Sequence, residues 1–314
     1  MGEIFTMTLA NVVKMLIFIG VGYLLSHTGR FPKDASKTLS TLATMLLLPA
    51  YNIKNLSQNF TVDKVGEKLL ILGFGVICVV AALGLAWLLA KWLGKSDLEI
   101  RTLVYAYTIP NYAYFGYPLI EAVFGAPFLA DVMVFTLPFS IMTNTYGYWL
   151  LTKNTTGTKV TFKRLITTPV IWAPFIGITM GLTQLQLPEM VTNLLSSSAA
   201  CMNPISMLLV GFALGNTKIW KLFTGGRAYF LSAIRMIGIP LVFFVVLFFT
   251  GMRGDFLLIP LLVMSMPIGV NTVVFPESCG EDATDNARIL FISYIMALVF
   301  LPLVFSLITK LAAL

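Results

Sequence analysis

The stretch TIPNYAYFGYPLI, residues 108–120, places four helix-interrupting residues inside a long apolar segment: Pro110, Asn111, Gly116 and Pro118. Proline lacks a backbone donor and clashes with the preceding turn, so it kinks or breaks a helix. The segment begins near Arg101, which puts Pro110 about nine residues, or roughly 14 Å, along a helix. That depth is close to half of the roughly 30 Å hydrocarbon core of a bilayer. If the segment crosses a membrane, its break lies near the midplane.

The composition indicates an all-α integral membrane protein. The 314 residues are 58% hydrophobic and only 11% charged, whereas soluble domains carry about 25% charged residues. Uncharged runs at 69–90 and 289–309 are each long enough to cross the bilayer, which takes about 20 apolar residues. The net charge of +7 does not suggest nucleic-acid binding, because the chain has no long basic run.

Apolar segments separated by polar punctuation predict ten transmembrane helices. They lie near 5–26, 37–56, 68–92, 101–124, 129–152, 166–184, 189–214, 227–250, 255–278 and 286–311. The polar and basic stretch 153–165 divides the chain almost at its centre. We therefore expect a first five-helix repeat at 1–152, a linker at 153–165 and a second repeat at 166–314.

The distribution of lysine and arginine predicts the orientation. The loops and flanks after the odd-numbered helices hold fourteen of these residues, and the opposite side holds five. Positive residues concentrate in cytoplasmic loops. The chain is therefore expected to be a multi-pass protein of the plasma membrane with both termini extracytoplasmic.

An odd number of helices in each half means that the second repeat is inverted relative to the first. Matching prolines support this: Pro110 and Pro267 are 157 residues apart, and Pro118 and Pro276 are 158 apart. Pro49 and Pro204 add a third pair, with an offset of 155. Inverted repeats with interrupted helices in corresponding places are typical of secondary transporters that bind substrate at the midplane.

A pair of broken helices suits an anion. The second half of a broken helix begins with free N–H groups and a partial positive charge of about half an elementary charge. Two such ends at one point attract a carboxylate without a buried lysine. Asn111 and Asn271, beside Pro110 and Pro267, could donate to that ligand or satisfy freed backbone groups, and both roles are compatible.

Several motifs resemble the auxin efflux carrier family, which includes the plant PIN-FORMED carriers and bacterial permeases for malate and related acids. They are GYLL (22–25), LSTLATMLLLPAYNIKNLS (39–57), PNYAYFGYPLIEAVFG (110–125) and MPIGVNTVVF (266–275). The resemblance covers the whole chain. The short linker differs from the very long loop of the plant carriers and favours a compact bacterial or archaeal member.

The resemblance implies two inverted five-helix repeats in which helices 4 and 9 are broken and cross, as in bile-acid symporters and sodium–proton antiporters. Helices 1, 2, 6 and 7 would form a scaffold, often homodimeric, and helices 3–5 and 8–10 a transport unit that moves as an elevator. The matching positions are Pro110, Pro267, Asn111 and Asn271 at the crossover and Asn52 in helix 2. The acid of plant helix 3 has no counterpart here, so the coupling ion stays open.

Other polar residues inside the expected helices are further candidates. Tyr112 and Tyr146 are candidates to reach the crossover. Glu121 could bind a coupling proton or simply be solvated by a nearby loop, and Lys14 could act in transport or in structural pairing. Arg235 could serve a function or extend its charge toward the cytoplasmic surface.

These features favour a secondary transporter of small organic anions, malate-like or auxin-like mono- or dicarboxylates, that works by elevator-type alternating access. A sodium-coupled symporter of the same fold and a non-transporting membrane receptor are the alternatives. An enzyme is not expected, because the helices lack a Ser-His or Asp pair and magnesium-binding acidic clusters. No cofactor is expected, and a chain with His27 as its single histidine cannot build a two-histidine metal site.

Overall fold

The computed structural model describes residues 2–32, 34–156 and 167–312, and within these ranges the chain is helical and has no strand. Most of the predicted linker 153–165 lies outside the described residues. Six helical stretches are long and apolar enough to cross a membrane: Gly2–His27, Val62–Leu93, Ala126–Thr152, Glu189–Leu214, Gly226–Phe249 and Thr284–Ala312. Two shorter apolar helices, Pro169–Thr183 and Asp255–Met264, accompany them.

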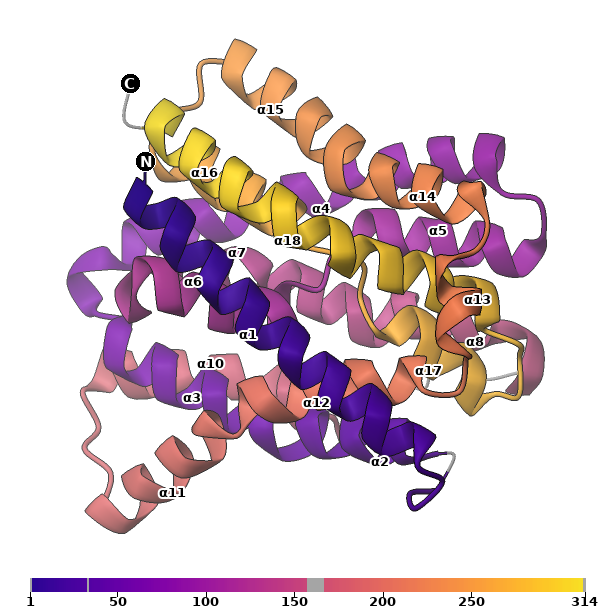
Figure 1. The fold of residues 1–314 in the computed structure, drawn as a ribbon. Coiled ribbons are helices and arrows are strands. Elements are labelled where there is room, and N and C mark those ends of the chain that lie inside the picture. Colours follow the sequence, from indigo (N-terminus) through magenta and orange to yellow (C-terminus); the bar gives the residue numbers. More distant parts are fainter. Residues whose placement is uncertain (1, 33, 157–166, 313–314) are drawn as a thin grey trace.

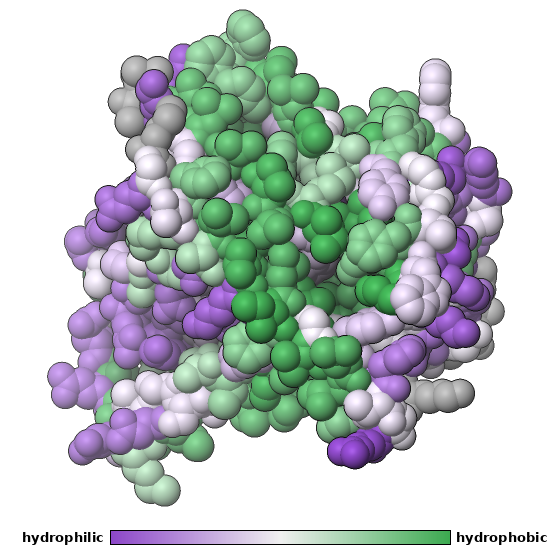
Figure 2. Space-filling view, viewed as in Figure 1, coloured by the Kyte–Doolittle hydropathy of each residue, from purple (hydrophilic) through white to green (hydrophobic). Residues whose placement is uncertain are grey.

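The helices form a bundle with two distinct ends (Figure 1). Both termini lie at one end, and the opposite end carries α2 (Ala35–Leu42), α8 (Tyr148–Thr156) and α13 (Ile219–Phe223). A broad hydrophobic band separates two hydrophilic ends on the face shown in Figure 2. An apolar band between polar ends is the surface expected of a protein whose helices lie in a bilayer.

Two helix pairs make the most extensive contacts of the bundle. One joins α1 (Gly2–His27) to α12 (Met202–Leu214), and the other joins α3 (Leu48–Asn59) to α10 (Pro169–Thr183). Glycine permits both contacts, because a Cβ at Gly211 would lie 2.2 Å from the carbonyl oxygen of Ile19, and one at Gly181 would lie 2.4 Å from that of Phe60. Small residues that let backbones approach closely are a usual basis of helix packing in membranes.

Three prolines each follow a widened π-helical turn. Pro49, Pro118 and Pro240 are the second residues of α3, α6 (Tyr117–Phe124) and α15 (Ile239–Phe249). The turns before them are η1 (Ala43–Leu47), η3 (Tyr112–Gly116) and η5 (Ile234–Gly238), and η5 follows α14 (Gly226–Ala233). Proline cannot donate to the carbonyl four residues earlier and clashes with it, so a wider turn accommodates the ring.

The chain interrupts two helices, as the sequence predicts. α5 (Asp97–Thr108) ends before Pro110 and η3 follows, whereas α16 (Asp255–Met264) ends before Pro267 and α17 (Asn271–Ser278) follows. We call residues 109–111 and 265–270 together the crossing. It is narrower than the clusters of helix breakers in the sequence, because Pro118 and Pro276 lie inside helices.

Side chains from other helices replace the backbone donors that these two prolines lack. The carbonyl four residues before Pro118 belongs to Tyr114, and the buried Ser206 hydroxyl donates to it at 3.1 Å. The carbonyl four residues before Pro276 belongs to Thr272, and the Asn286 side-chain amide donates to it at 2.8 Å. Such replacement allows proline to remain within a membrane helix.

The remaining helices surround the two interrupted ones. α4 (Val65–Leu93) packs against α5 and against α7 (Ala126–Met142), which continues through η4 (Thr143–Gly147) into α8. α18 (Thr284–Ala312) packs against α14, α16 and α17 and also contacts α1. α11 (Glu189–Ala200) contacts α3 and extends away from the bundle in Figure 1. The crossing is therefore enclosed by helices from both halves of the chain.

Candidate functional site

The two interruptions meet each other at the centre of the bundle. The backbone N–H of Asn111 donates to the carbonyl of Pro267 at 2.9 Å, and Pro110 and Ile268 form an isolated antiparallel bridge. The N–H of Ile268 donates to the Ser293 hydroxyl of α18 at 3.2 Å. Unwound backbone at this depth needs internal partners because lipid supplies none. Each interruption thus supplies a partner for the other.

A cavity of about 350 Å³ lies beside the crossing. This volume falls within the range of small-molecule sites. Of the described lining residues, Lys37 is the charged one, and the others are neutral. The polar ones are mostly hydroxyls and amides, among them Ser40, Thr41, Thr44, Tyr105, Asn111, Tyr112, Ser140, Thr143, Asn144, Tyr148, Thr168, Asn271 and Ser278.

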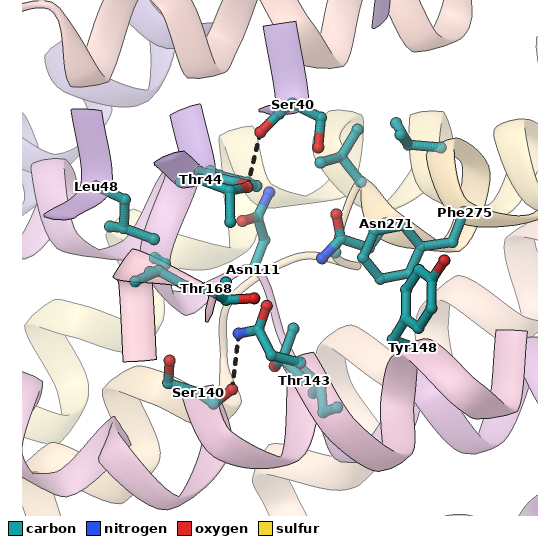
Figure 3. Close-up of a pocket in the computed structure, with 18 of the residues that line it drawn as sticks. Ser40, Thr44, Leu48, Asn111, Ser140, Thr143, Tyr148, Thr168, Asn271 and Phe275 are labelled. Carbon is teal, nitrogen blue, oxygen red and sulfur yellow. Dashed lines mark hydrogen bonds between the residues drawn. The ribbon is translucent and has the colours of Figure 1, made fainter. Parts of the chain in front are cut away.

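Asn111 and Asn271 reach this cavity from different halves of the chain. Figure 3 shows them at the same opening, with Ser40 and Thr44 on one side and Ser140 and Thr143 on the other. A tyrosine from another helix anchors each amide. Asn111 Nδ2 donates to the Tyr294 hydroxyl, and Asn271 Nδ2 donates to the Tyr105 hydroxyl at 3.0 Å. These bonds fix the amides, so a ligand would meet preset groups.

The N-termini of α17 and η3 also lie at the cavity. α17 begins at Asn271 and η3 begins at Tyr112, and both residues belong to the lining. The first N–H groups of a helix have no partner within it and carry a partial positive charge. Gly269 and Val270, directly before α17, also line the cavity. The arrangement therefore offers backbone donors, fixed amides and hydroxyls to a negatively charged or strongly polar group.

The structure brings five of the predicted site residues together. Pro110, Asn111, Tyr112 and Asn271 line the cavity, and the carbonyl of Pro267 accepts the Asn111 N–H behind it.

The other four predicted residues lie outside the lining. Asn52 is buried in α3. The Tyr146 hydroxyl accepts a hydrogen bond from Trp87 Nε1 at 3.0 Å, which directs it to α4. Glu121 accepts a hydrogen bond from the Tyr51 hydroxyl of α3, and Lys14 is exposed on α1.

Sequence reasoning missed the hydroxyl lining that α2, η1, α7 and η4 supply. Ser40 and Thr44, like Ser140 and Asn144, are four residues apart and therefore share a helix face. Thr44 and Thr143 also donate to the carbonyls of Ser40 and Phe139, both at 2.7 Å. A polar residue at every fourth position along a helix is the signal that could have identified this face.

Comparison with known proteins agrees with this architecture. A family model described as membrane transport protein matches residues 7–305. An uncharacterized transporter from Methanothermobacter thermautotrophicus is 25% identical over 307 residues, which cover 96% of this chain and 98% of that protein. The family and the apolar helices make the chain a multi-pass membrane protein. It belongs to the membrane transport protein family, an auxin-efflux-carrier-like family of transporters rather than of enzymes, as the resemblance predicted.

Proposed function

We propose that this protein is a secondary transporter of small organic anions, mono- or dicarboxylates, and that it holds the anion in the cavity beside the crossing. One observation carries the proposal: two interrupted helices present their N-terminal ends and two anchored asparagines, Asn111 and Asn271, to the same polar cavity. Helix N-termini bind carboxylates and phosphates through free N–H groups and the helix dipole.

The charges of the lining favour an anion over a cation. The described lining contains no aspartate or glutamate, and its one charged side chain, Lys37, is positive. A cation site would need carboxylates or converging carbonyls. Lys37 is exposed. Lys37 would therefore attract an anion electrostatically, whereas the amides, hydroxyls and backbone donors deeper in the cavity would bind that anion.

Packing contacts support the inverted repeat of ten helices. A Cβ on Gly22 in α1 would lie 3.0 Å from the Cα of Leu208 in α12, and one on Gly177 in α10 would lie 3.1 Å from the Cα of Ile53 in α3. Gly177 follows Gly22 by 155 residues, and Leu208 follows Ile53 by 155 residues. Pro204 follows Pro49 by the same offset. α1–α12 and α3–α10 would then be one contact seen twice, once in each orientation.

The contact pattern also supports a division into scaffold and transport unit. Within the proposed scaffold α1 packs against α12 and α3 packs against α10. Within the proposed transport unit α4 packs against α5 and α7, and α18 packs against α14 and α16. The contact between α1 and α18 joins the two groups. The cavity lies where η1 of the first group faces the crossing in the second. In the proposed mechanism the second group would slide past the first as an elevator, with the scaffold forming a homodimer.

The cavity reaches the end of the bundle opposite the termini, where Lys37, Thr167 and Ser278 line it. The excess of positive residues assigns that end to the cytoplasm. We therefore infer an inward-facing state in the plasma membrane, with both termini extracytoplasmic.

Uptake of radiolabelled malate, lactate and indole-3-acetate into proteoliposomes tests the proposal. Wild-type protein should transport at least one of them. Asn111→Ala and Asn271→Ala should each raise KM roughly tenfold or more, because a hydrogen bond to a charged group contributes about 1.5–3 kcal/mol. Asn11→Ala is the matched control, since Asn11 bonds only its own helix, at Met7. Undiminished transport in both site variants would refute the site, and binding without flux would favour a receptor.

A further inference from the structure

Arg235 is a fully buried charge that the proposed anion site does not use. It lies in η5 and is 0% exposed. Its Nη2 donates to the carbonyl of Met266 at 3.1 Å, and Nε and Nη1 have no hydrogen-bond partner among the described residues. No described carboxylate forms an ion pair with it. A buried charge without an ion-pair partner is strongly unfavourable, so another source of negative potential has to compensate it.

The carbonyl end of α16 is that source. α16 ends at Met264, and Met266 is the second residue beyond it, directly before Pro267. The last carbonyls of a helix have no donor within it and carry a partial negative charge, which a cation stabilises. Arg235 therefore contacts a carbonyl just beyond the negative end of one interrupted helix, whereas the cavity lies at the positive end of α17.

In transporters with interrupted helices, N-terminal ends hold the anionic substrate, and unwound carbonyls and C-terminal ends hold a coupling sodium ion or proton. Here a guanidinium covalently attached to the chain contacts one such unwound carbonyl, that of Met266. We propose that Arg235 is a tethered cation that takes the place of a coupling ion at the carbonyl end of α16. This inference rests on the proposed anion transport, and it makes that transport independent of sodium.

A short path connects Arg235 to the cavity. Arg235 donates to the Met266 carbonyl. The next carbonyl, that of Pro267, accepts the N–H of Asn111, and Asn111 lines the cavity. Arg235 is thus a positioning residue, because it acts through the crossing and is absent from the cavity lining. Its fixed positive charge also lowers the cost of bringing an anion to the other side of the same peptide segment.

The test measures KM for whichever of malate, lactate and indole-3-acetate the wild-type protein transports fastest, in proteoliposomes with sodium and with choline in its place. Wild-type KM should be the same in both media. Arg235→Lys should stay within about threefold of wild type, because it keeps the charge. Arg235→Met should raise KM at least tenfold, and added sodium or guanidinium should recover part of the loss in this variant alone.

Arg253→Met is the control. Arg253 donates only to the nearby carbonyls of Phe248 and Met252 in an exposed loop, so its loss should leave KM unchanged. A purely structural Arg235 would change thermal stability without creating ion dependence. An unchanged KM in folded Arg235→Met would overturn the inference. A sodium requirement in wild-type protein would also overturn the inference, and that measurement does not depend on the folding of any variant. Absence of uptake of all three anions would instead refute the proposed function.

Discussion

The hydroxyl of Ser206 is expected to stabilise the protein because a proline elsewhere leaves a carbonyl without its helical donor. Pro118 cannot donate to the carbonyl of Tyr114, and Ser206 Oγ of α12 donates to it at 3.1 Å in a buried environment. Ser206→Ala removes that donor and leaves the oxygen unpaired. Pro118→Ala supplies a backbone N–H four residues after Tyr114, in position to pair with the same oxygen.

The expected loss in Ser206→Ala is about 1 kcal/mol. A buried acceptor without a partner costs roughly 1–3 kcal/mol, but hydrogen bonds between membrane helices average about 0.6 kcal/mol and reach about 1.7 kcal/mol. The Ser206 hydroxyl also lies 3.0 Å from the carbonyl of Asn203, so its single proton is shared between two acceptors. In a Pro118→Ala background the same substitution should cost less than about half as much, because Tyr114 then has a second donor.

Unfolding in mixed micelles with increasing dodecyl sulfate measures both costs in a double-mutant cycle. Thr179→Ala serves as the control, since Thr179 is exposed on α10 and its hydroxyl donates only to the Phe175 carbonyl of its own helix. A Ser206→Ala cost that is equal in the two backgrounds would show that the hydroxyl does not compensate for the proline, and the explanation would be wrong.

Two further predictions concern helix packing and pH. Gly211→Ala should destabilise the protein by roughly 1–3 kcal/mol or more, because the new Cβ would lie 2.2 Å from the Ile19 carbonyl oxygen. Gly84→Ala is the control in the same unfolding assay, because a Cβ on Gly84 would meet open space. Burial raises the pKa of Glu99, but the hydrogen bonds from Arg227 and from the backbone N–H of Lys95 and the positive charges of these two residues together outweigh this, and the pKa lies below its usual value. The stabilisation that ionised Glu99 provides is therefore present above the unfolded pKa of about 4.3 and is lost as pH falls. The Tm values of wild type and Glu99→Gln should converge on acidification. A Tm difference that stays constant with pH would contradict a stabilising role for the Glu99 carboxylate.

The position of the crossing could be predicted because proline has a local effect. Proline lacks the backbone N–H donor and interrupts a helix when the surrounding structure does not replace that donor, as at Pro110 and Pro267. Pro118 and Pro276 look equivalent in the sequence but remain within helices, since Ser206 and a side chain of α18 supply donors. These partners are far away along the chain, and local sequence cannot reveal them.

Helix phase separates neighbouring candidate residues that point to different sides of one helix. Asn144 and Tyr148 are four residues apart and line the cavity, whereas Tyr146 lies two residues from each and so points to the other side of the helix. That contrast was available from spacing alone. Lys14 is different: α1 is apolar around most of its circumference, so no pattern distinguishes its exposed face from its packed one.

The segment formed by η3 and α6, which begins at the crossing, also carries three hydrogen bonds that would have to break during the proposed elevator movement. Tyr114 in η3 hydrogen-bonds to Thr44 of η1 at 3.1 Å and accepts from Ser206 of α12, and Glu121 in α6 accepts from Tyr51 of α3. Net contributions of about 0.5–1.5 kcal/mol each give roughly 1.5–4.5 kcal/mol for the three together. A difference of that size can be reversed by an anion that binds two conformations with unequal affinity. The N-terminus of this same segment lies at the cavity. Binding of an anion there and the release of these three hydrogen bonds would therefore both act on one rigid segment.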